Sequence, residues 1–174
     1  MIMMVEENLK RLNDVLYQSV SLEISDICIE KEAVEYCGYN FKLGTLSVKF
    51  RRAKITPKKT GQFVTLWQRS KTGTTEPFSL EDSFDLYIIN IENGNDSGYF
   101  VFPREILADR KILSVNGQGG KRGFRVYPKW DLPENKQAKK TQSWQTLYFT
   151  DPHLLPLLIT TYIPNTSQQV TLSD

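Results

Sequence analysis

Apolar and polar positions follow two different periods along the chain. Over residues 4–18 the apolar side chains recur at helical spacing, which predicts an amphipathic N-terminal helix. Further along, the period changes to two, which is typical of β-strands with one buried face. Strands are predicted at residues 33–43, 46–54, 62–69, 85–92, 99–102 and 124–127.

Turn signals separate these segments and show how they are joined. The loop 93–98 contains Asn93-Gly94, a strong hairpin signal. Pro103 suits the first turn of a short helix at 104–109, and a longer helix is expected from residues 133–135 to about Tyr148. The pattern therefore predicts an α+β fold, with a mostly antiparallel, barrel-like β-sheet flanked by N-terminal and C-terminal helices.

Length and composition narrow the class of protein. The 174 residues suit a single domain, expected over residues 1–164, with a polar tail at 165–174. The 40% hydrophobic content argues against wholesale disorder. Apolar runs stay shorter than the roughly 18–20 residues of a membrane span, so no membrane association is expected. The N-terminus turns acidic at once, unlike a signal peptide, and two isolated cysteines fit a reduced cytoplasmic protein.

The net charge of +2 hides a strong segregation of charge. Residues 1–40 carry eight acids against three bases, and residues 76–109 carry eight against one. The first basic block, residues 49–71, has eight bases and no acid, whereas the second basic block, residues 110–140, has nine bases and two acids. If folding brought the basic blocks together, they would form a surface for polyanions. Alternatively, they pair with the acidic segments.

The basic blocks contain the residue types that nucleic-acid binding needs: cations for phosphates, planar donors for base edges and aromatic rings for stacking. Lys49 and Arg51 are expected on the outward face of one strand, about 7 Å apart along it. Lys58 and Lys59 would extend this row on a loop. The candidate contact residues are Lys49, Arg51, Arg52, Lys54, Lys58, Lys59, Gln62, Arg69, Lys121, Arg122, Arg125, Tyr127, Lys129, Trp130, Asn135, Lys136 and Lys139.

Four strings of residues carry a resemblance to a known family. They are AKITPKKTGQFVTLWQR (53–69), FPREIL (102–107), KRGFRVYPKWD (121–131) and QAKKTQSWQTLYF (137–149). Together they resemble the MepB family of small bacterial cytoplasmic proteins, over roughly residues 32–150. A weaker, fold-level resemblance is to the DNA-recognition pseudobarrels of some restriction enzymes and plant transcription factors, which implies a modest expectation of DNA binding.

Support for an enzyme is weaker. The lone His153 excludes zinc sites built on several histidines within one chain. Glu134-Asn135-Lys136 matches the Glu-x-Lys triplet of metal-dependent nucleases, but it follows a proline and opens a helix instead of lying on a strand. Asp82 and Asp85 are the better candidate metal ligands, with loop capping or ion pairing as the ordinary alternative. No cofactor, metal or catalytic residue is therefore expected.

The sequence thus predicts a non-enzymatic nucleic-acid-binding protein that uses basic faces from residues 49–71 and 117–140, with DNA favoured over RNA. Two alternatives stay open. One is a metal-dependent nuclease or another enzyme acting on a phosphate-bearing substrate, and the other is a protein–protein adaptor.

Overall fold

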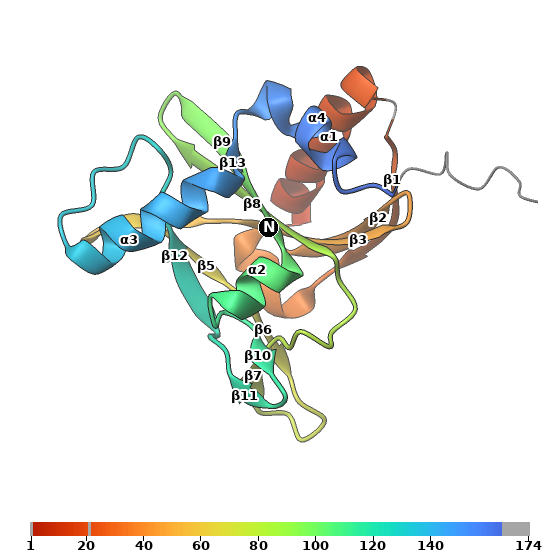
Figure 1. Ribbon diagram of the computed structural model, residues 1–174. Helices are drawn as coiled ribbons and strands as arrows, with labels where there is room; N and C mark the ends of the chain where they lie inside the picture. The colour runs from red at the N-terminus through yellow and green to blue at the C-terminus, as the bar shows by residue number, and fades with distance from the viewer. Residues whose placement is uncertain (1, 21, 165–174) are drawn as a thin grey trace, which may run out of the picture.

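The computed structural model describes residues 2–20 and 22–164 (Figure 1). Its centre is a six-stranded sheet in the order β1-β2-β3-β8-β9-β13, in which only the β3–β8 neighbours run parallel. The sheet has two edges, β1 and β13, so it does not close into a barrel. Its strands are β1 (Ile24–Ile29), β2 (Tyr39–Leu43), β3 (Leu46–Arg52), β8 (Leu86–Asn93), β9 (Asp96–Pro103) and β13 (Phe149–Thr150).

Smaller sheets and helices cover this central sheet. A three-stranded sheet in the order β12-β5-β4 and two short ribbons, β6–β7 and β10–β11, lie on the side of α2 and α3 (Figure 1). The expected α+β class, mostly antiparallel with helices toward both ends, is confirmed. The remaining elements are α1 (Ile2–Val20), β4 (Lys54–Thr56), β5 (Lys59–Thr65), β6 (Trp67–Arg69), β7 (Thr75–Pro77), α2 (Arg104–Asp109), β10 (Ser114–Val115), β11 (Gln118–Gly119), β12 (Gly123–Val126), α3 (Lys136–Gln145) and α4 (Leu155–Thr160), with 3₁₀ turns at Lys31–Tyr36, Thr146–Tyr148 and Pro152–Leu154.

Strand β8 is apolar over residues 86–89 and at Ile91 because both of its faces are buried there. Leu86 and Ile88 join one hydrophobic cluster, whereas Tyr87, Ile89 and Ile91 join the other. A strand buried on both sides needs apolar side chains on both faces, and an alternating pattern supplies them on one face only. The prediction that the most apolar segment is a central strand is confirmed.

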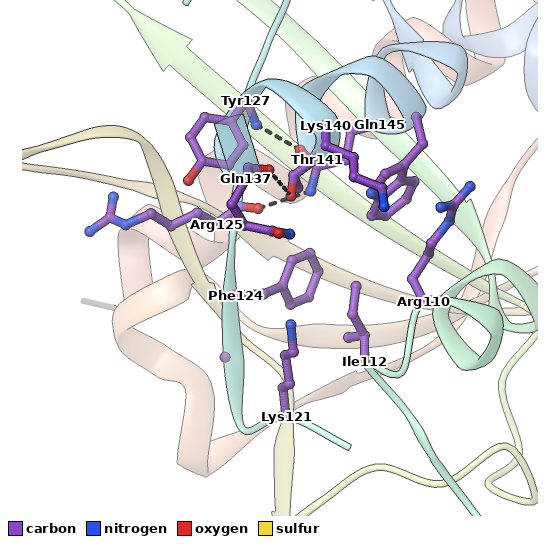
Figure 2. Close-up of a pocket in the computed structure, with 12 residues that line it drawn as sticks. Arg110, Ile112, Lys121, Phe124, Arg125, Tyr127, Gln137, Lys140, Thr141 and Gln145 are labelled. Carbon is purple, nitrogen blue, oxygen red and sulfur yellow. Dashed lines mark hydrogen bonds between the residues drawn. The ribbon is translucent and has the colours of Figure 1, made fainter. Parts of the chain in front are cut away.

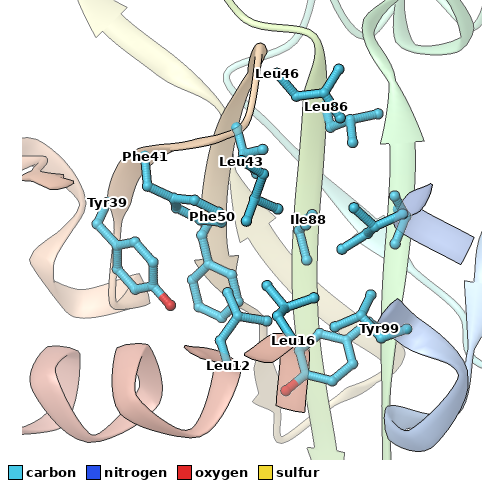
Figure 3. Packing of buried hydrophobic residues seen from close by; sticks show 14 of the residues in the cluster. Leu12, Leu16, Tyr39, Phe41, Leu43, Leu46, Phe50, Leu86, Ile88 and Tyr99 are labelled. Carbon is cyan, nitrogen blue, oxygen red and sulfur yellow. The ribbon is translucent and has the colours of Figure 1, made fainter. Parts of the chain in front are cut away.

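The first cluster lies between the sheet and the helices α1 and α4. Leu12 and Leu16 of α1 are fully buried and face side chains from β2, β3 and β8 (Figure 3). Helix α4, which the sequence shows only as an apolar stretch, adds Leu155 and Ile159 beside α1. The helical spacing at the N-terminus therefore correctly identified a core-facing helix.

One predicted strand is wrong in its first half. Residues 31–36 form a 3₁₀ turn, Cys37 takes the left-handed conformation (φ 48°), and β2 starts only at Tyr39. Gly38 explains the turn: a Cβ there would lie 2.5 Å from the Ala33 Cβ and 2.8 Å from the Arg51 guanidinium. The alternation of aromatic residues suggested a strand, but a close tertiary approach decided the backbone.

The segment around residues 54–69 also differs from expectation. The expected loop at 56–61 is the tip of the β4–β5 hairpin, and the expected single strand at 62–69 is divided between β5 and β6. The division falls at Leu66, which is fully buried and whose N–H donates to the Arg122 carbonyl. With this side chain buried, the backbone leaves the β12-β5-β4 sheet after β5, and the next segment, β6, pairs with β7.

The short helix α2 begins and ends where predicted, directly after Pro103. Helix α3 begins after Asn135, as expected, but ends at Gln145 and continues only as a 3₁₀ turn.

Within the described ranges, none of the helices combines the length and apolar character that crossing a bilayer requires. The expected polar tail at 165–174 lies outside the described residues.

Candidate nucleic-acid interface

The first two cations of the first basic block, Lys49 and Arg51, lie inside the protein. Side chains on β3 alternate as predicted, but the face opposite the first cluster is covered by the second layer instead of solvent. Arg51 is 1% exposed and pairs with Glu30. Lys49 Nζ lies 2.5 Å from Glu30 Oε1 and 4.0 Å from the centre of the Phe78 ring. The expectation of an outward row formed by Lys49 and Arg51 is therefore wrong, because a sheet covered on both sides has no outward face.

A single carboxylate, that of Glu30, pairs with both buried cations. Burial acts to raise the pKa of Glu30, but the adjacent Arg51 and Lys49 outweigh it and hold that pKa below its usual value. Burial lowers the pKa of Lys49, while the Glu30 carboxylate opposes the change. Lys49 Nζ also donates to Asn40 Oδ1 at 3.1 Å. Glu30 thus supplies the counter-charge that both buried cations need. Arg51 also donates to the Phe50 carbonyl at 2.8 Å, while its Nε has no partner among the described residues.

Half of the remaining cations of the first block pair with acids from other segments. Gln62 is buried and donates to the Glu92 carbonyl. Lys58 and Lys59, at the β4–β5 turn, are exposed and make no ion pair with the described residues. Three further cations are paired: Arg52 with Glu92 (2.5 Å), Lys54 with Glu35 (3.1 Å) and Arg69 with Glu32 (2.6 Å).

Two arginines of the second basic block are held by hydrogen bonds to uncharged groups and not by acids. Arg125 donates to the Gly61 carbonyl at 3.0 Å and to Thr56 Oγ1 at 2.7 Å. Arg122 donates to the carbonyl and hydroxyl of Thr75. Because these acceptors are uncharged, both guanidinium groups keep their full positive charge in a fixed position.

A cavity of about 380 Å³ lies between β12, the end of α2 and α3 (Figure 2). Cations reach it from all three elements, and Arg110 stacks over Trp144 with its guanidinium 4.9 Å from the ring centre. No Asp or Glu is among the described residues that line it. They are Arg110, Ile112, Lys121, Gly123, Phe124, Arg125, Tyr127, Gln137, Lys140, Thr141, Trp144 and Gln145.

A second cavity, of about 480 Å³, adjoins the first, since Arg125 and Tyr127 line both. It lies beside the β4–β5 turn and the start of α3, and its other lining residues include Lys58, Lys59, Glu134 and Asn135. We call the cations that line the two cavities the basic surface: Lys58, Lys59, Arg110, Lys121, Arg125 and Lys140. Lys136 and Lys139 are exposed on α3 nearby.

Buried amides hold this surface together. Gln145 is fully buried; its Oε1 accepts from the Tyr127 N–H at 2.9 Å and its Nε2 donates to the Arg125 carbonyl at 2.9 Å. Gln142 Nε2 donates to the carbonyls of Pro128 and Asp131. These bonds attach α3 to the free edge of β12, so the walls of both cavities are fixed relative to each other.

Tyr127 occupies its position because Gly61 has no side chain. Gly61 has a positive φ of 82°, and a Cβ there would lie 2.7 Å from the Tyr127 ring. The N–H of Gly61 also donates to Asp131, and although this bond lowers the pKa of that carboxyl, burial keeps the pKa above its usual value. Asn135 serves as the N-cap of α3, accepting from the Ala138 N–H at 2.8 Å.

Two other predicted contact residues have structural partners. Lys129 Nζ lies 3.0 Å from both carboxylate oxygens of Asp151. Trp130 is half-buried, with its ring centre 5.6 Å from that of Phe149. The candidate contact residues drawn from the sequence do not include Arg110 and Lys140, which also line the site. Lys140 is one helical turn after Lys136, so helical periodicity could have included it, whereas no local signal distinguishes Arg110.

The candidate metal ligands have ordinary structural roles. Asp82 Oδ2 accepts from the Ser79 N–H and from Gln68 Nε2, and Asp85 Oδ2 accepts from the Ser47 N–H. Across residues 2–20 and 22–164, no three metal-ligating side chains come together.

Comparison with known proteins identifies the family. The MepB-like family model matches residues 30–151. The chain belongs to the MepB-like family. A crystal structure of MepB is 38% identical to this MepB-like chain, with a TM-score of 0.72, and the match covers 79% of this chain and 93% of that one. The resemblance drawn from the four sequence strings, over about residues 32–150, is thereby confirmed.

The MepB-like fold also resembles that of an enzyme. A bacterial homing endonuclease matches with a TM-score of 0.50 at 13% identity, covering 97% of both chains. Identity this low shows a likeness of fold alone. No curated protein matches the chain.

Proposed function

We propose that this MepB-like protein is a non-enzymatic nucleic-acid-binding protein that holds DNA against the basic surface. One observation carries the proposal. The six cations that line the two adjoining cavities make no ion pair with the described residues, although most cations of the first block do. Glu134 also lines the second cavity, but none of the six cations pairs with it. Cations gathered without ion-pair partners favour a polyanion, because each phosphate bound releases counterions.

Helix α3 supports the same proposal. Its first turn has Lys136 and Lys139 and no acid, and Lys140 follows directly. Cations near a helix N-terminus oppose the helix dipole and lower stability slightly. A bound phosphate chain would offset this cost, so the arrangement suits a helix that faces an anion better than one selected for stability.

The proposal covers fewer residues than the sequence indicated. It retains Lys58, Lys59, Lys121, Arg122, Arg125, Tyr127, Asn135, Lys136 and Lys139, and it adds Arg110 and Lys140. It omits the cations held in ion pairs, whose release would leave acids such as Glu30 unpaired inside the protein. A cytoplasmic location remains part of the proposal.

Fluorescence anisotropy tests it, with labelled double-stranded DNA, single-stranded DNA and RNA at low and high salt. We expect binding in the presence of chelator that weakens steeply with salt, with DNA bound more tightly than RNA. The nucleic acid should stay intact after Mg²⁺ is added. Degradation that depends on Mg²⁺ would favour the nuclease alternative, and absence of binding at low salt would overturn the proposal.

A further inference from the structure

We propose that the 380 Å³ cavity between β12, α2 and α3 accepts one unpaired nucleotide, so that the protein prefers DNA in which a base has left the stack. The inference rests on the proposed function and names the feature of DNA that this cavity selects. The second cavity, beside Lys58 and Lys59, would contact the backbone only.

The cavity has a suitable size and charge. Its volume falls within the range of small-molecule sites, which begins near 300 Å³. Arg110 directly after α2, Lys121 in the loop before β12 and Lys140 on α3 line it (Figure 2), and no Asp or Glu is among its described lining residues. This charge favours an anionic occupant, such as a nucleotide phosphate.

The walls are suited to a planar group. Phe124, Tyr127 and Trp144 all line the cavity. Backbone contacts alone would need cations but not aromatic rings, whereas an extruded base is held by stacking on such rings. The aromatic lining is therefore what separates a nucleotide from a bare phosphate as the occupant.

A polar group is available for the base edge. Gln137 is exposed on α3, and within the described residues its side-chain amide makes no hydrogen bond. An amide offers one donor and one acceptor side by side, which matches the edge of a base. Gln137 is thus placed to contact the base while the cations contact its phosphate.

The cavity is built before any ligand arrives. Gln145 ties α3 to β12 through two backbone hydrogen bonds, and Arg110 is stacked over Trp144. In a preformed site, little free energy is lost to ordering the walls when a ligand binds. An unpaired base should therefore gain affinity relative to paired DNA of the same charge.

The test compares three short duplexes that differ at one position: fully paired, with one bulged nucleotide, and with a bulged abasic sugar-phosphate. We expect the bulged nucleotide to bind about tenfold more tightly than the other two, the scale of stacking one base on an aromatic side chain. With 2-aminopurine as the bulged base, its fluorescence should decrease on binding.

Variants on two faces of α3 locate the effect. Thr141→Trp fills the cavity and should abolish the preference while leaving paired DNA bound. Ser143→Trp is the matched control, because it removes a similar hydroxyl-to-carbonyl bond outside the cavity and should retain the preference. Arg110→Ala/Lys140→Ala, which removes charge without adding bulk, should also lose the preference.

The outcomes separate the two proposals. Equal binding of all three duplexes, or a preference that survives Thr141→Trp, would overturn the nucleotide site and leave salt-dependent DNA binding in place. If none of the duplexes binds at low salt, the proposed function itself fails and the nucleotide site fails with it.

Discussion

The two basic blocks are nearly equal in charge but differ in what the fold does with that charge. In the first block five of eight cations form ion pairs, whereas in the second one of nine does so within the described residues. The first block lies against the acidic segment around Glu30, Glu32 and Glu35. In the second block β12 packs against α3, and the lysines of α3 belong to the same block. Charge along a sequence therefore becomes charge on a surface only where no acidic segment folds against it.

The largest expected effect is a loss of stability when the acid that pairs with the buried cations of the first block is removed. Glu30→Gln removes the acid shared by Lys49 and Arg51 and leaves two buried cations unpaired. Losing one partner of a buried ion pair costs about 3–5 kcal/mol, so urea unfolding should show a loss of this size. DNA affinity measured below the unfolding transition should be unchanged. An equal loss of affinity would place the first block in the interface after all.

The same group predicts a dependence of stability on pH. The folded pKa of Glu30 is lowered, so its stabilisation is fully present above about pH 4.5 and is lost as pH falls through the folded pKa. Unfolding free energies measured between pH 7 and pH 3 should decline more steeply for the unaltered protein than for Glu30→Gln. If the two proteins lost stability equally as the pH fell, the lowered pKa of Glu30 would be contradicted.

A change at the second block should reduce both stability and binding. Gln145→Leu keeps the volume but leaves the Tyr127 N–H and the Arg125 carbonyl without partners. Unsatisfied buried groups cost about 1–3 kcal/mol each, and the join between α3 and β12 should loosen. We expect a lower midpoint in urea together with weaker DNA binding. Weaker stability with unaltered binding would show that the surface does not need α3 fixed.

Removing exposed cations should affect binding alone. Lys58→Ala/Lys59→Ala should weaken binding to all sequences and flatten the slope of log affinity against log salt by about two units. Lys54→Ala/Arg69→Ala is the matched control, because it removes two cations that are already paired, and should leave that slope nearly unchanged. If only Lys54→Ala/Arg69→Ala flattened the slope, Lys54 and Arg69 would contact the DNA and Lys58 and Lys59 would not.

The smallest effect is expected at the exposed pair of the first block. Glu32→Gln removes the partner of Arg69, and because both groups are solvent-exposed, the thermal midpoint should hardly move. Freed from its acid, Arg69 could add slightly to low-salt DNA binding. A large drop in the midpoint would show that the pair matters for the fold.

Local pattern predicted much of the scaffold. The N-terminal helix, the central strand, the 93–98 hairpin and α2 all follow from periodicity, glycine or proline, which act within a few residues. The exposed edge strand β1 and the split between β5 and β6 were not predicted. These depend on which distant strand is available for pairing, and no short window contains that information.

The candidate site was predicted in part for the same reason. The four family strings located the right segments, and Lys121, Arg125 and Asn135 do line the two cavities. Lys49 and Arg51 were misplaced because alternation shows that two side chains share a face but not what covers that face. Arg110 was missed because it joins the cavity only where the chain after α2 brings its guanidinium over Trp144 of α3.

The sequence by itself determined the fold class, the family and the presence of two strongly basic segments, since these are properties of composition, spacing and local pattern. Only the tertiary structure decided which segment is neutralised. Coulomb energy depends on the distance between charges and on burial, and Glu30 lies 19 residues from Lys49 along the chain but 2.5 Å away in space.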